Sequence, residues 1–340
     1  MVRGTTADVA PHWPRLTRTG VLAPSLVALA IVAVMIGPYA LTPGQTLASL
    51  VGQGDPQVAI VVWNIRVPRV AAALLVGGAL AAAGASYQAL FRNPLVSPDI
   101  LGVSAGAGLG AVAGIFLSLP VAAIQFSAFV GGMAAVGFVM LVASAVRNTD
   151  RTLTLVLIGV VIGALAGAAT SLLKVMADPY DQLPAITFWL LGSLAAITTE
   201  DILPALPMVL VGLVPLTLLR WRINVLSLGD EEARPLGIEA GRTRFLVMSA
   251  ATLITASVTA LAGVVGWVGL VIPHIARMLV GLDFGRVLPA SVSIGAGYLL
   301  IVDTLARTMA QIEVPLGILT AVIGAPFFVW LLPHGRRGWS

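Results

Sequence analysis

Four basic residues could do chemistry that the rest of this apolar chain could not. Arg66 and Arg69 occur together as RVPR, Arg307 follows Asp303 by four residues, and Lys174 is the one lysine in 340 residues. An arginine can hold a carboxylate through two parallel hydrogen bonds, whereas a lysine within or near a membrane is costly and often functional. Simpler roles remain open: interfacial anchoring for Arg66 and Arg69, and a helical ion pair with Asp303 for Arg307.

Several kinds of catalytic or metal chemistry are excluded by the residues that the chain lacks. A P-loop needs GxxxxGK followed by Ser or Thr, but Lys174 is preceded by Leu173, so any ATP must bind to another chain. There are no cysteines, which removes thiolate metal sites and cysteine nucleophiles. His12 lies in the expected amino-terminal tail and His334 directly after the last expected span, and His274 at a helix break is typical of a hydrogen-bonded structural group. We therefore expect no catalytic residue, no metal site and no cofactor.

The composition predicts an all-α integral membrane protein. Hydrophobic residues make up 58% of the chain and charged residues only 10%, whereas a soluble domain has about 25% charged residues. Spanning a bilayer takes about 20 mainly apolar residues per helix, and such windows follow one another from Val21 onward. The apolar runs are continuous, which excludes a β-barrel, and the basic residues are scattered, which argues against nucleic acid as a partner.

About ten transmembrane helices are expected, at 21–41, 68–90, 98–117, 120–146, 152–177, 199–219, 243–265, 268–282, 287–308 and 315–333. With the amino terminus inside, all but four of the 19 Lys and Arg residues fall on the inner side, the exceptions being Arg66, Arg69, Lys174 and Arg307. The positive-inside rule therefore favours cytoplasmic amino and carboxyl termini. The first apolar run is too long for a signal peptide. Residues 1–20 and 336–340 are expected as cytoplasmic tails, and 21–335 as one polytopic membrane domain whose eighth span, with Pro273, is broken or short.

The stretch FRNPLVSPDILGVSAGAGLG, residues 91–110, predicts a cytoplasmic turn followed by a closely packed helix. Pro94 cannot continue the preceding helix, and Ser97 is expected as the N-cap of the next one, with Pro98 at its first position. Small residues then recur at helical spacing, which lets helices approach closely where lipid supplies little hydrophobic drive. A later span repeats the spacing, and the glycines predicted for packing are Gly102, Gly106, Gly110, Gly159, Gly163 and Gly167.

Two polar segments interrupt the spans. On the inner side, the segment 225–240 contains VLSLGDEEARPLG and predicts a short helix, capped by Asp230 and ended by Gly237, that suits a partner's groove; a solvated loop is the simpler alternative. On the outer side, residues 178–184 precede an apolar run through Trp189 that is too short to cross, which predicts a half-helix lining a cavity. Lys174 and Trp189 are candidate contacts for substrate in this outer vestibule, although an ion pair with Asp178 or snorkelling also accounts for Lys174.

Several motifs occur in an order that resembles one family. They are RVPR at 66–69, G-x3-Q-x3-RNPL-x2-P-x3-LG-x3-GA from Gly84 to Ala107, WLLGSL at 189–194, LSLGDEEARPLG at 226–237, GWVGLVIPHIAR at 266–277 and EVPLGILTAVIGAPFF at 313–328. Together, over about residues 20–335, they resemble the permease subunit of the type II ABC importers for iron chelates, haem and cobalamin. Trp267 stands where Phe is expected, and the stretch 283–286, DFGR, replaces an acidic-His-Arg stretch.

The resemblance implies a homodimer of ten-helix permeases in the lipid bilayer, two cytoplasmic ATPase subunits and a soluble periplasmic binding protein. It implies that Arg66, Arg69 and Arg307 dock carboxylates of the binding protein. It also implies a coupling helix that sits in the ATPase cleft, made of Leu228, Gly229, Asp230, Glu231, Glu232, Ala233, Arg234, Leu236 and Gly237.

We therefore expect a non-enzymatic subunit of the bacterial inner membrane that imports an iron chelate, siderophore or haem, by alternating access. Cobalamin or a metal oxyanion is the alternative cargo. A proton-coupled secondary transporter is a weaker alternative, because its best proton carrier, Asp303, has Arg307 beside it and lies towards the outer side. A membrane enzyme is disfavoured because paired histidine and carboxylate ligands would be required.

Overall fold

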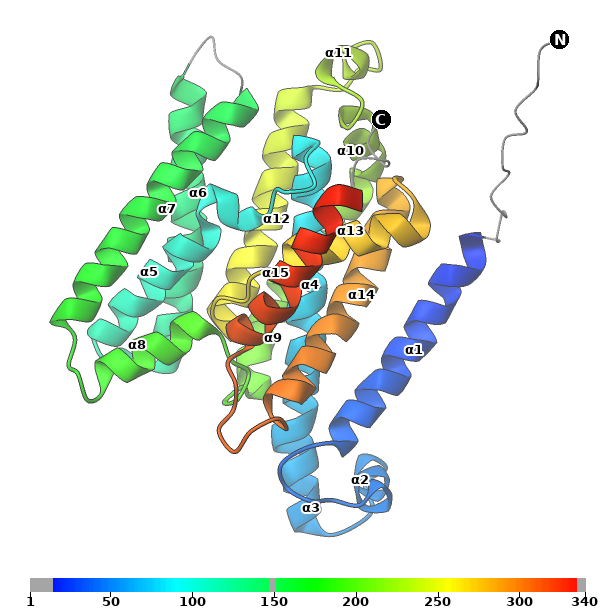
Figure 1. Ribbon diagram of the computed structural model, residues 1–340, viewed down its shortest axis with the longest axis vertical. Helices are drawn as coiled ribbons and strands as arrows, with labels where there is room; N and C mark the ends of the chain where they lie inside the picture. Colours follow the sequence, from blue (N-terminus) through cyan, green and yellow to red (C-terminus); the bar gives the residue numbers. More distant parts are fainter. Residues whose placement is uncertain (1–14, 147–150, 335–340) are drawn as a thin grey trace.

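The computed structural model describes residues 15–146 and 151–334, and within these ranges every regular element is a helix (Figure 1). The longer helices are α1 (Arg15–Met35), α4 (Val67–Phe91), α5 (Val103–Phe116), α6 (Val121–Ala145), α7 (Arg151–Met176), α9 (Thr199–Leu218), α12 (Ala240–Ala262), α13 (Val268–Val280), α14 (Phe284–Ala306) and α15 (Leu316–His334). Shorter elements join them: α2 (Pro43–Leu50), α3 (Pro56–Ile60), the π-helical turn Val61–Arg66, the 3-10 helix Pro98–Leu101, α8 (Gln182–Leu191), α10 (Arg220–Leu226) and α11 (Asp230–Ala233).

Short helices mark the two ends of the bundle (Figure 1). The end that carries α10 and α11 is called the α11 end, and the opposite one, with α2 and α3, is called the α2 end. α4 runs from the α2 end towards the α11 end, and α14 runs back beside it. Residues near 66 and near 307 therefore come to the same end of the molecule.

Each of the ten expected intervals overlaps one of the longer helices, so the predicted order of elements agrees with the structure. Within the described residues, six segments are long and apolar enough to cross a membrane: Pro56–Phe91, Val121–Ala145, Leu153–Met176, Thr199–Leu218, Ala240–Ala262 and Phe284–Ala306. α1, α5, α13 and α15 add shorter apolar stretches. The chain is a multi-pass membrane protein, while the count of ten crossings stays a prediction.

The first helix differs from its expected bounds. α1 begins at Arg15, inside the segment expected as a tail, and ends at Met35, short of residue 41. Gly37 and Pro38 follow, and the residue before a proline disfavours helical backbone, which ends the helix early. The remainder of the expected tails, residues 1–14 and 336–340, lies outside the described residues.

α4 and α12 form the interior of the bundle with α14. In the most apolar windows of the segments that contain α4 and α12, 83% and 78% of the residues are buried, against 22% for α7 and α9. Glycines allow the close approach: a Cβ on Gly77 would meet the carbonyl of Gly295 on α14, and a Cβ on Gly84 would meet that of Gly269 on α13. α4 is thereby held against α13 and α14 by main-chain contact.

The link between α4 and α5 differs from the prediction made for Ser97. Pro98–Leu101 forms a separate 3-10 helix, and Gly102, in the left-handed conformation (φ 79°), separates it from α5. The Ser97 side chain makes no cap hydrogen bond; its hydroxyl donates to Asp99 at 3.4 Å. Ser97 and Pro98 hold the N-cap and first positions of this 3-10 helix, as predicted, but the single helix expected from residue 98 is divided because Gly102 adopts a left-handed backbone that a residue with a side chain rarely adopts.

Gln88 compensates for the proline in α13. This helix is short, as predicted, but runs through Pro273. Pro273 has no N–H, so the carbonyl of Gly269 loses its helical partner. The fully buried Gln88 side chain donates to the carbonyls of Gly269 and Leu270 at 3.3 and 3.0 Å, and its Oε1 accepts from Arg277. One residue of α4 thus supports the first and the last turn of α13.

Candidate functional site

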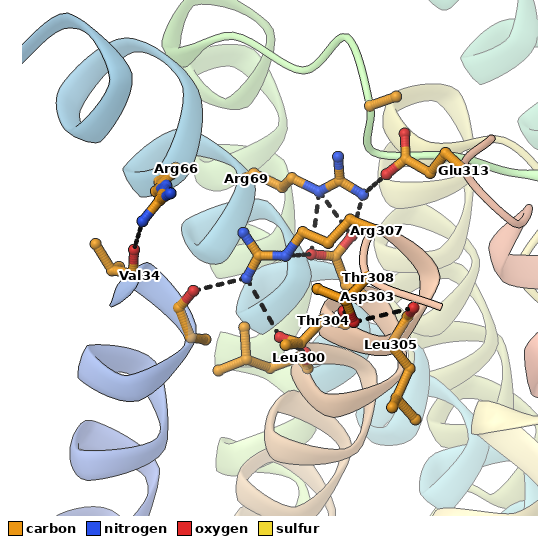
Figure 2. Close-up of polar contacts among 12 residues, drawn as sticks. Val34, Arg66, Arg69, Leu300, Asp303, Thr304, Leu305, Arg307, Thr308 and Glu313 are labelled. Carbon is orange, nitrogen blue, oxygen red and sulfur yellow. Dashed lines mark hydrogen bonds and ion pairs between the residues drawn. The ribbon is translucent and has the colours of Figure 1, made fainter. Parts of the chain in front are cut away.

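Three arginines and two carboxylates lie together at the α2 end (Figure 2). They are called the arginine–carboxylate cluster and comprise Arg66, Arg69, Asp303, Arg307 and Glu313. Arg66 closes the π-helical turn, Arg69 lies in the first turn of α4, and Asp303 lies in the last turn of α14. Arg307 follows α14, and Glu313 precedes α15. The packing of α4 against α14 brings these distant segments together.

Asp303 is the centre of the cluster. Its side chain is fully buried, and its two oxygens accept from Arg69 Nε at 2.9 and 3.1 Å. Arg307 Nε lies 3.7 Å from Oδ2, so the helical ion pair left open from the sequence is present, beyond hydrogen-bond distance. A buried carboxylate needs opposite charge and hydrogen bonds, and the arginines supply both. Protonation of Asp303 would leave the buried Arg307 without its ion-pair partner and Arg69 with Glu313 alone, which disfavours Asp303 as a proton carrier.

Glu313 is the most exposed carboxylate of the cluster. It accepts a hydrogen bond from Arg69 Nη2, and its side chain is 27% exposed, against 0% for Asp303. Arg69 therefore holds one buried carboxylate and one at the rim. Of the two ion pairs that Arg69 forms, the one with Glu313 lies nearer the surface.

Arg66 and Arg307 also bind the carboxyl-terminal end of α1 (Figure 2). Arg66 Nη1 donates to the carbonyls of Val34 and Met35 at 2.8 and 3.0 Å, and Arg307 Nη2 donates to that of Ala33 at 2.7 Å. The last carbonyls of a helix lack helical partners and attract positive charge. These two arginines thus fix α1 against α4 and α14.

The docking role implied for the arginines stays a prediction. Arg66, Arg69 and Arg307 are only 3%, 8% and 6% exposed, because each is bonded within the chain. Sequence reasoning missed Glu313, although an acidic residue with no basic neighbour in sequence opens the motif EVPLG. It also missed the main-chain carbonyls of α1 as hydrogen-bond acceptors, because no side-chain type in the sequence marks them.

The predicted coupling segment, 225–240, projects at the α11 end (Figure 1). Asp230 is not its N-cap: Gly229 (φ 143°) holds that position, and the Asp230 oxygens accept from Arg244 at 2.6 and 2.7 Å. The prediction was wrong because a bidentate guanidinium is a stronger partner for a carboxylate than a main-chain N–H. Gly237 ends the turn in the left-handed conformation (φ 73°), as predicted.

This segment presents a mixed surface. Leu228 and Leu236 are 67% and 54% exposed, although leucine is usually buried. Glu231, Glu232 and Arg234 are exposed beside them, and Ala233 is buried. The pairing of Asp230 with Arg244 anchors the segment to α12.

Lys174 and Trp189 lie on different helices with different surroundings. Lys174 is half-buried in the last turn of α7, and no ion pair joins it to Asp178 within the described residues. Asp178 instead accepts from the main-chain N–H groups of Tyr180 and Asp181, both at 2.9 Å. α8 is a ten-residue helix at the α2 end, which agrees with the predicted half-helix, and Trp189 packs against alanines of α5, α6 and α12. Contact of either residue with substrate stays a prediction.

The predicted packing glycines have different environments. Cβ atoms on Gly106 and Gly110 would overlap the main chain of α6, and one on Gly159 would overlap that of the 3-10 helix. Gly163 and Gly167 have open space where a Cβ would stand. Close packing at these two positions would require a second chain.

The described residues contain no group of three or more histidine and carboxylate side chains placed to hold a metal ion. His274 is half-buried on α13, and its Nδ1 is buried without a hydrogen-bond partner in the described part of the chain. The hydrogen bond expected for His274 is therefore not seen at this atom.

The comparison with known families decides the class of protein. The model of the FecCD transport family matches residues 25–334. This chain belongs to the FecCD transport family. It is 38% identical over 319 residues to the molybdate import system permease protein MolB of Haemophilus influenzae, and the match covers 92% of this chain and 94% of the relative. It is 40% identical over 320 residues to the Fe(3+)-citrate import system permease protein YfmE of Bacillus subtilis, covering 93% and 95%.

A solved structure supports the same assignment. An inward-facing conformation of a protein described as a metal-chelate type ABC transporter matches the FecCD chain with a TM-score of 0.86 and 37% identity, covering 94% of this chain and 99% of that one. The resemblance read from the motifs is confirmed, and the chain is an ABC importer permease. The relatives are named for different cargoes, so membership of the family leaves the cargo open.

Proposed function

We propose that this permease imports an iron chelate, siderophore or haem, from the periplasm to the cytoplasm by alternating access. Two copies form the transporter in the bacterial inner membrane, with both termini and the α11 end in the cytoplasm. The distribution of arginine along the sequence supports this orientation. A separate ATPase supplies the energy, since the sequence contains no P-loop.

The coupling segment supports this function most directly. Exposed leucines beside exposed charges, on a turn anchored to α12, suit a groove in a partner better than they suit solvent. Two ATPase subunits, one under each permease, would move this segment when ATP closes them. The movement shifts the helices between outward-open and inward-open states only if ATP and cargo prefer different states.

The arginine–carboxylate cluster marks the end at which a binding protein delivers cargo. Direct docking on Arg66 or Arg307 would require these side chains to leave the carbonyls of α1. Arg69 offers an easier route, because its contact with Glu313 lies at the rim. A carboxylate of the binding protein exchanges with Glu313 on Arg69, while Asp303 keeps the buried charge paired.

Iron chelates are favoured as cargo by the similarity to the ferric citrate permease and to the metal-chelate transporter. The similarity to MolB makes a metal oxyanion the specific alternative, and cobalamin is the other cargo to be tested. Retention of ferric siderophore, haem, cobalamin or molybdate by the partner binding protein separates these cargoes.

Reconstitution tests the function as a whole. Proteoliposomes with the permease, its ATPase and its binding protein should accumulate labelled ferric chelate only with ATP, and the permease alone should hydrolyse none. Leu236→Asp should abolish ATP-driven uptake, whereas Leu95→Asp, at an exposed leucine in the loop after α4, should retain it. Uptake driven by a proton gradient without ATP would contradict the assignment.

A further inference from the structure

Asp99 lies on the 3-10 helix that links α4 to α5, and the proposed function gives it no role. α4 ends at the α11 end, but the chain then turns back into the bundle (Figure 1). A Cβ on Gly159 of α7 would overlap the carbonyl oxygen of Ile100, and one on Gly269 of α13 would lie 3.6 Å from Pro98 Cδ. The 3-10 helix is therefore held between α7 and α13.

These contacts place the 3-10 helix at membrane depth. Gly159 is six residues from the start of the apolar segment Leu153–Met176, which is long enough to cross a membrane. Gly269 packs on Gly84, which is seven residues from the end of the crossing segment Pro56–Phe91. At 1.5 Å per residue these separations are about 9 and 11 Å. The 3-10 helix thus lies within the length of two membrane-crossing helices.

At this depth the side chain of Asp99 is exposed and has no counter-ion. Its oxygens accept from the hydroxyl of Ser104 and, at 3.4 Å, from that of Ser97, and both donors are neutral. No ion pair in the described part of the chain involves Asp99. Ionisable groups and irregular backbone at membrane depth avoid lipid and face either the protein interior or a water-filled cavity. Because Asp99 is exposed on this chain, the water-filled cavity remains.

The part of α7 beside the 3-10 helix is open as well. A Cβ on Gly102 would lie 3.6 Å from the main-chain nitrogen of Gly163, so this part of α7 adjoins the 3-10 helix. A Cβ on Gly163 itself would meet open space, and only 22% of the most apolar window of α7 is buried. A second copy packed against α7 would therefore enclose water next to Asp99.

We propose that Asp99 lines the aqueous path through which cargo passes between two copies of the permease. An ionised carboxylate offers hydrogen-bond acceptors only. Asp99 therefore holds water in the path and meets the hydrogen-bond donors of the cargo, which are amide, hydroxyl or ammonium groups. The passage of cargo beside Asp99 rests on the proposed function, whereas the contact of Asp99 with water at membrane depth does not.

Cysteine labelling tests the contact with water, because the wild-type chain contains no cysteine. In proteoliposomes with a charged maleimide on both sides, Asp99→Cys should react at least about fiftyfold faster than Val211→Cys, since charged groups are depleted in hydrocarbon by at least this factor. Val211 is the matched control: it is 60% exposed, lies seven residues before the end of α9 and has the apolar, exposed neighbours Leu210 and Val214. Both variants should react equally once unfolded. Equally slow reaction of both in the membrane would overturn the inference.

The place of Asp99 on the path has a test of its own. With the ATPase and the binding protein present, a non-hydrolysable ATP analogue should change the labelling rate of Asp99→Cys, because alternating access opens and closes the path. A rate that does not respond to the analogue would overturn the path assignment in favour of a fixed, water-filled crevice.

Two further variants separate a role in the path from a structural role. Asp99→Asn keeps an acceptor oxygen and should retain part of the ATP-driven uptake of labelled ferric chelate, whereas Asp99→Leu should abolish it. The melting temperatures of both variants should equal that of the wild type, because the side chain is exposed. A fall in melting temperature that parallels the loss of uptake would make Asp99 structural and overturn its role in the path. If the wild type itself accumulates no chelate, the importer assignment fails, while the labelling still decides whether Asp99 meets water.

Discussion

Asp303 holds two buried guanidinium groups together, so its charge matters more than its shape. Asp303→Asn preserves the volume but removes the counter-ion of Arg307 and the more buried of the two counter-ions of Arg69. Breaking a buried ion pair typically costs about 3–5 kcal/mol, and we expect a loss of about 3 kcal/mol or more in the free energy of unfolding, measured as a lower denaturation midpoint in detergent. Asp55→Asn is the matched control, because Asp55 caps α3 and Asn caps equally well. Equal stability of both variants would show that the buried charge is unimportant.

Glu313 occupies Arg69 at the rim, where we propose that a binding protein competes. Glu313→Gln should change stability by less than about 1 kcal/mol, since the ion pair is partly exposed. The affinity for the binding protein should rise, because Arg69 is released for the partner's carboxylate. Titration of the binding protein against immobilised permease measures this, with Glu231→Gln at the α11 end as the control. A lower affinity would show that Glu313 itself contacts the partner.

Sequence patterns located the residues of this cluster better than they located its bonds. Arg66, Arg69 and Arg307 stood out because they violate the charge bias of the spans. Their acceptors did not, since main-chain carbonyls of α1 have no side-chain signature and Glu313 is 244 residues from Arg69. Only the ion pair of Arg307 with Asp303 could be anticipated from the sequence, because the two residues are four positions apart, at the end of one helix.

At the scale of elements, Gln88 is a brace between α4 and α13. Gln88→Met keeps a similar volume but leaves two carbonyls and the amide-bound nitrogen of Arg277 without this partner. An unsatisfied buried group costs about 1–3 kcal/mol, so we expect a loss of roughly 2 kcal/mol or more, read from thermal unfolding. Ser86→Ala on the same helix should cost less, because the Ser86 hydroxyl only donates to a carbonyl of its own helix, that of Ala82. A similar loss for both variants would contradict the bracing role.

Two glycines distinguish packing within a chain from packing between chains. Gly110→Ala inserts a methyl group into the main chain of α6, and overpacking typically costs about 1–3 kcal/mol. Gly163→Ala meets open space, so the stability of the isolated chain should not fall. Unfolding midpoints of the monomeric fraction measure both effects. If Gly163→Ala alone shifts the monomer–dimer equilibrium in detergent, Gly163 lies at the interface between two copies.

Element order was predictable from the sequence, while several boundaries were not. Long apolar runs predicted the membrane-spanning helices, because a helix that crosses the lipid must be apolar over about 20 residues. The turn at Gly102 and the N-terminus of α11 depend on backbone geometry and on a distant arginine, Arg244, neither of which a local pattern contains. α10 lies between the expected span 199–219 and the polar segment 225–240, where no helix was expected, and Ile223 and Leu226 are buried on it.

For the whole molecule, α4 joins the two sites. Arg69 lies at its first turn and Gln88 near its last, separated by most of a helix about 37 Å long at 1.5 Å per residue. One end binds α1 and α14 through charge, and the other binds α13 through an amide. One closely packed helix, α4, therefore connects the cluster at the α2 end with the supported turns of α13.

The sidedness of the two ends can be measured directly, because the chain contains no cysteine. Val51→Cys, just after α2, and Leu236→Cys, in the coupling segment, place single thiols at positions that are 71% and 54% exposed. A membrane-impermeant maleimide should label Val51→Cys on intact spheroplasts and Leu236→Cys only after permeabilisation. Both variants should label in detergent, and the wild type should never label. The reverse pattern would place the α11 end outside, where no ATP is available, and would remove the coupling role from this segment.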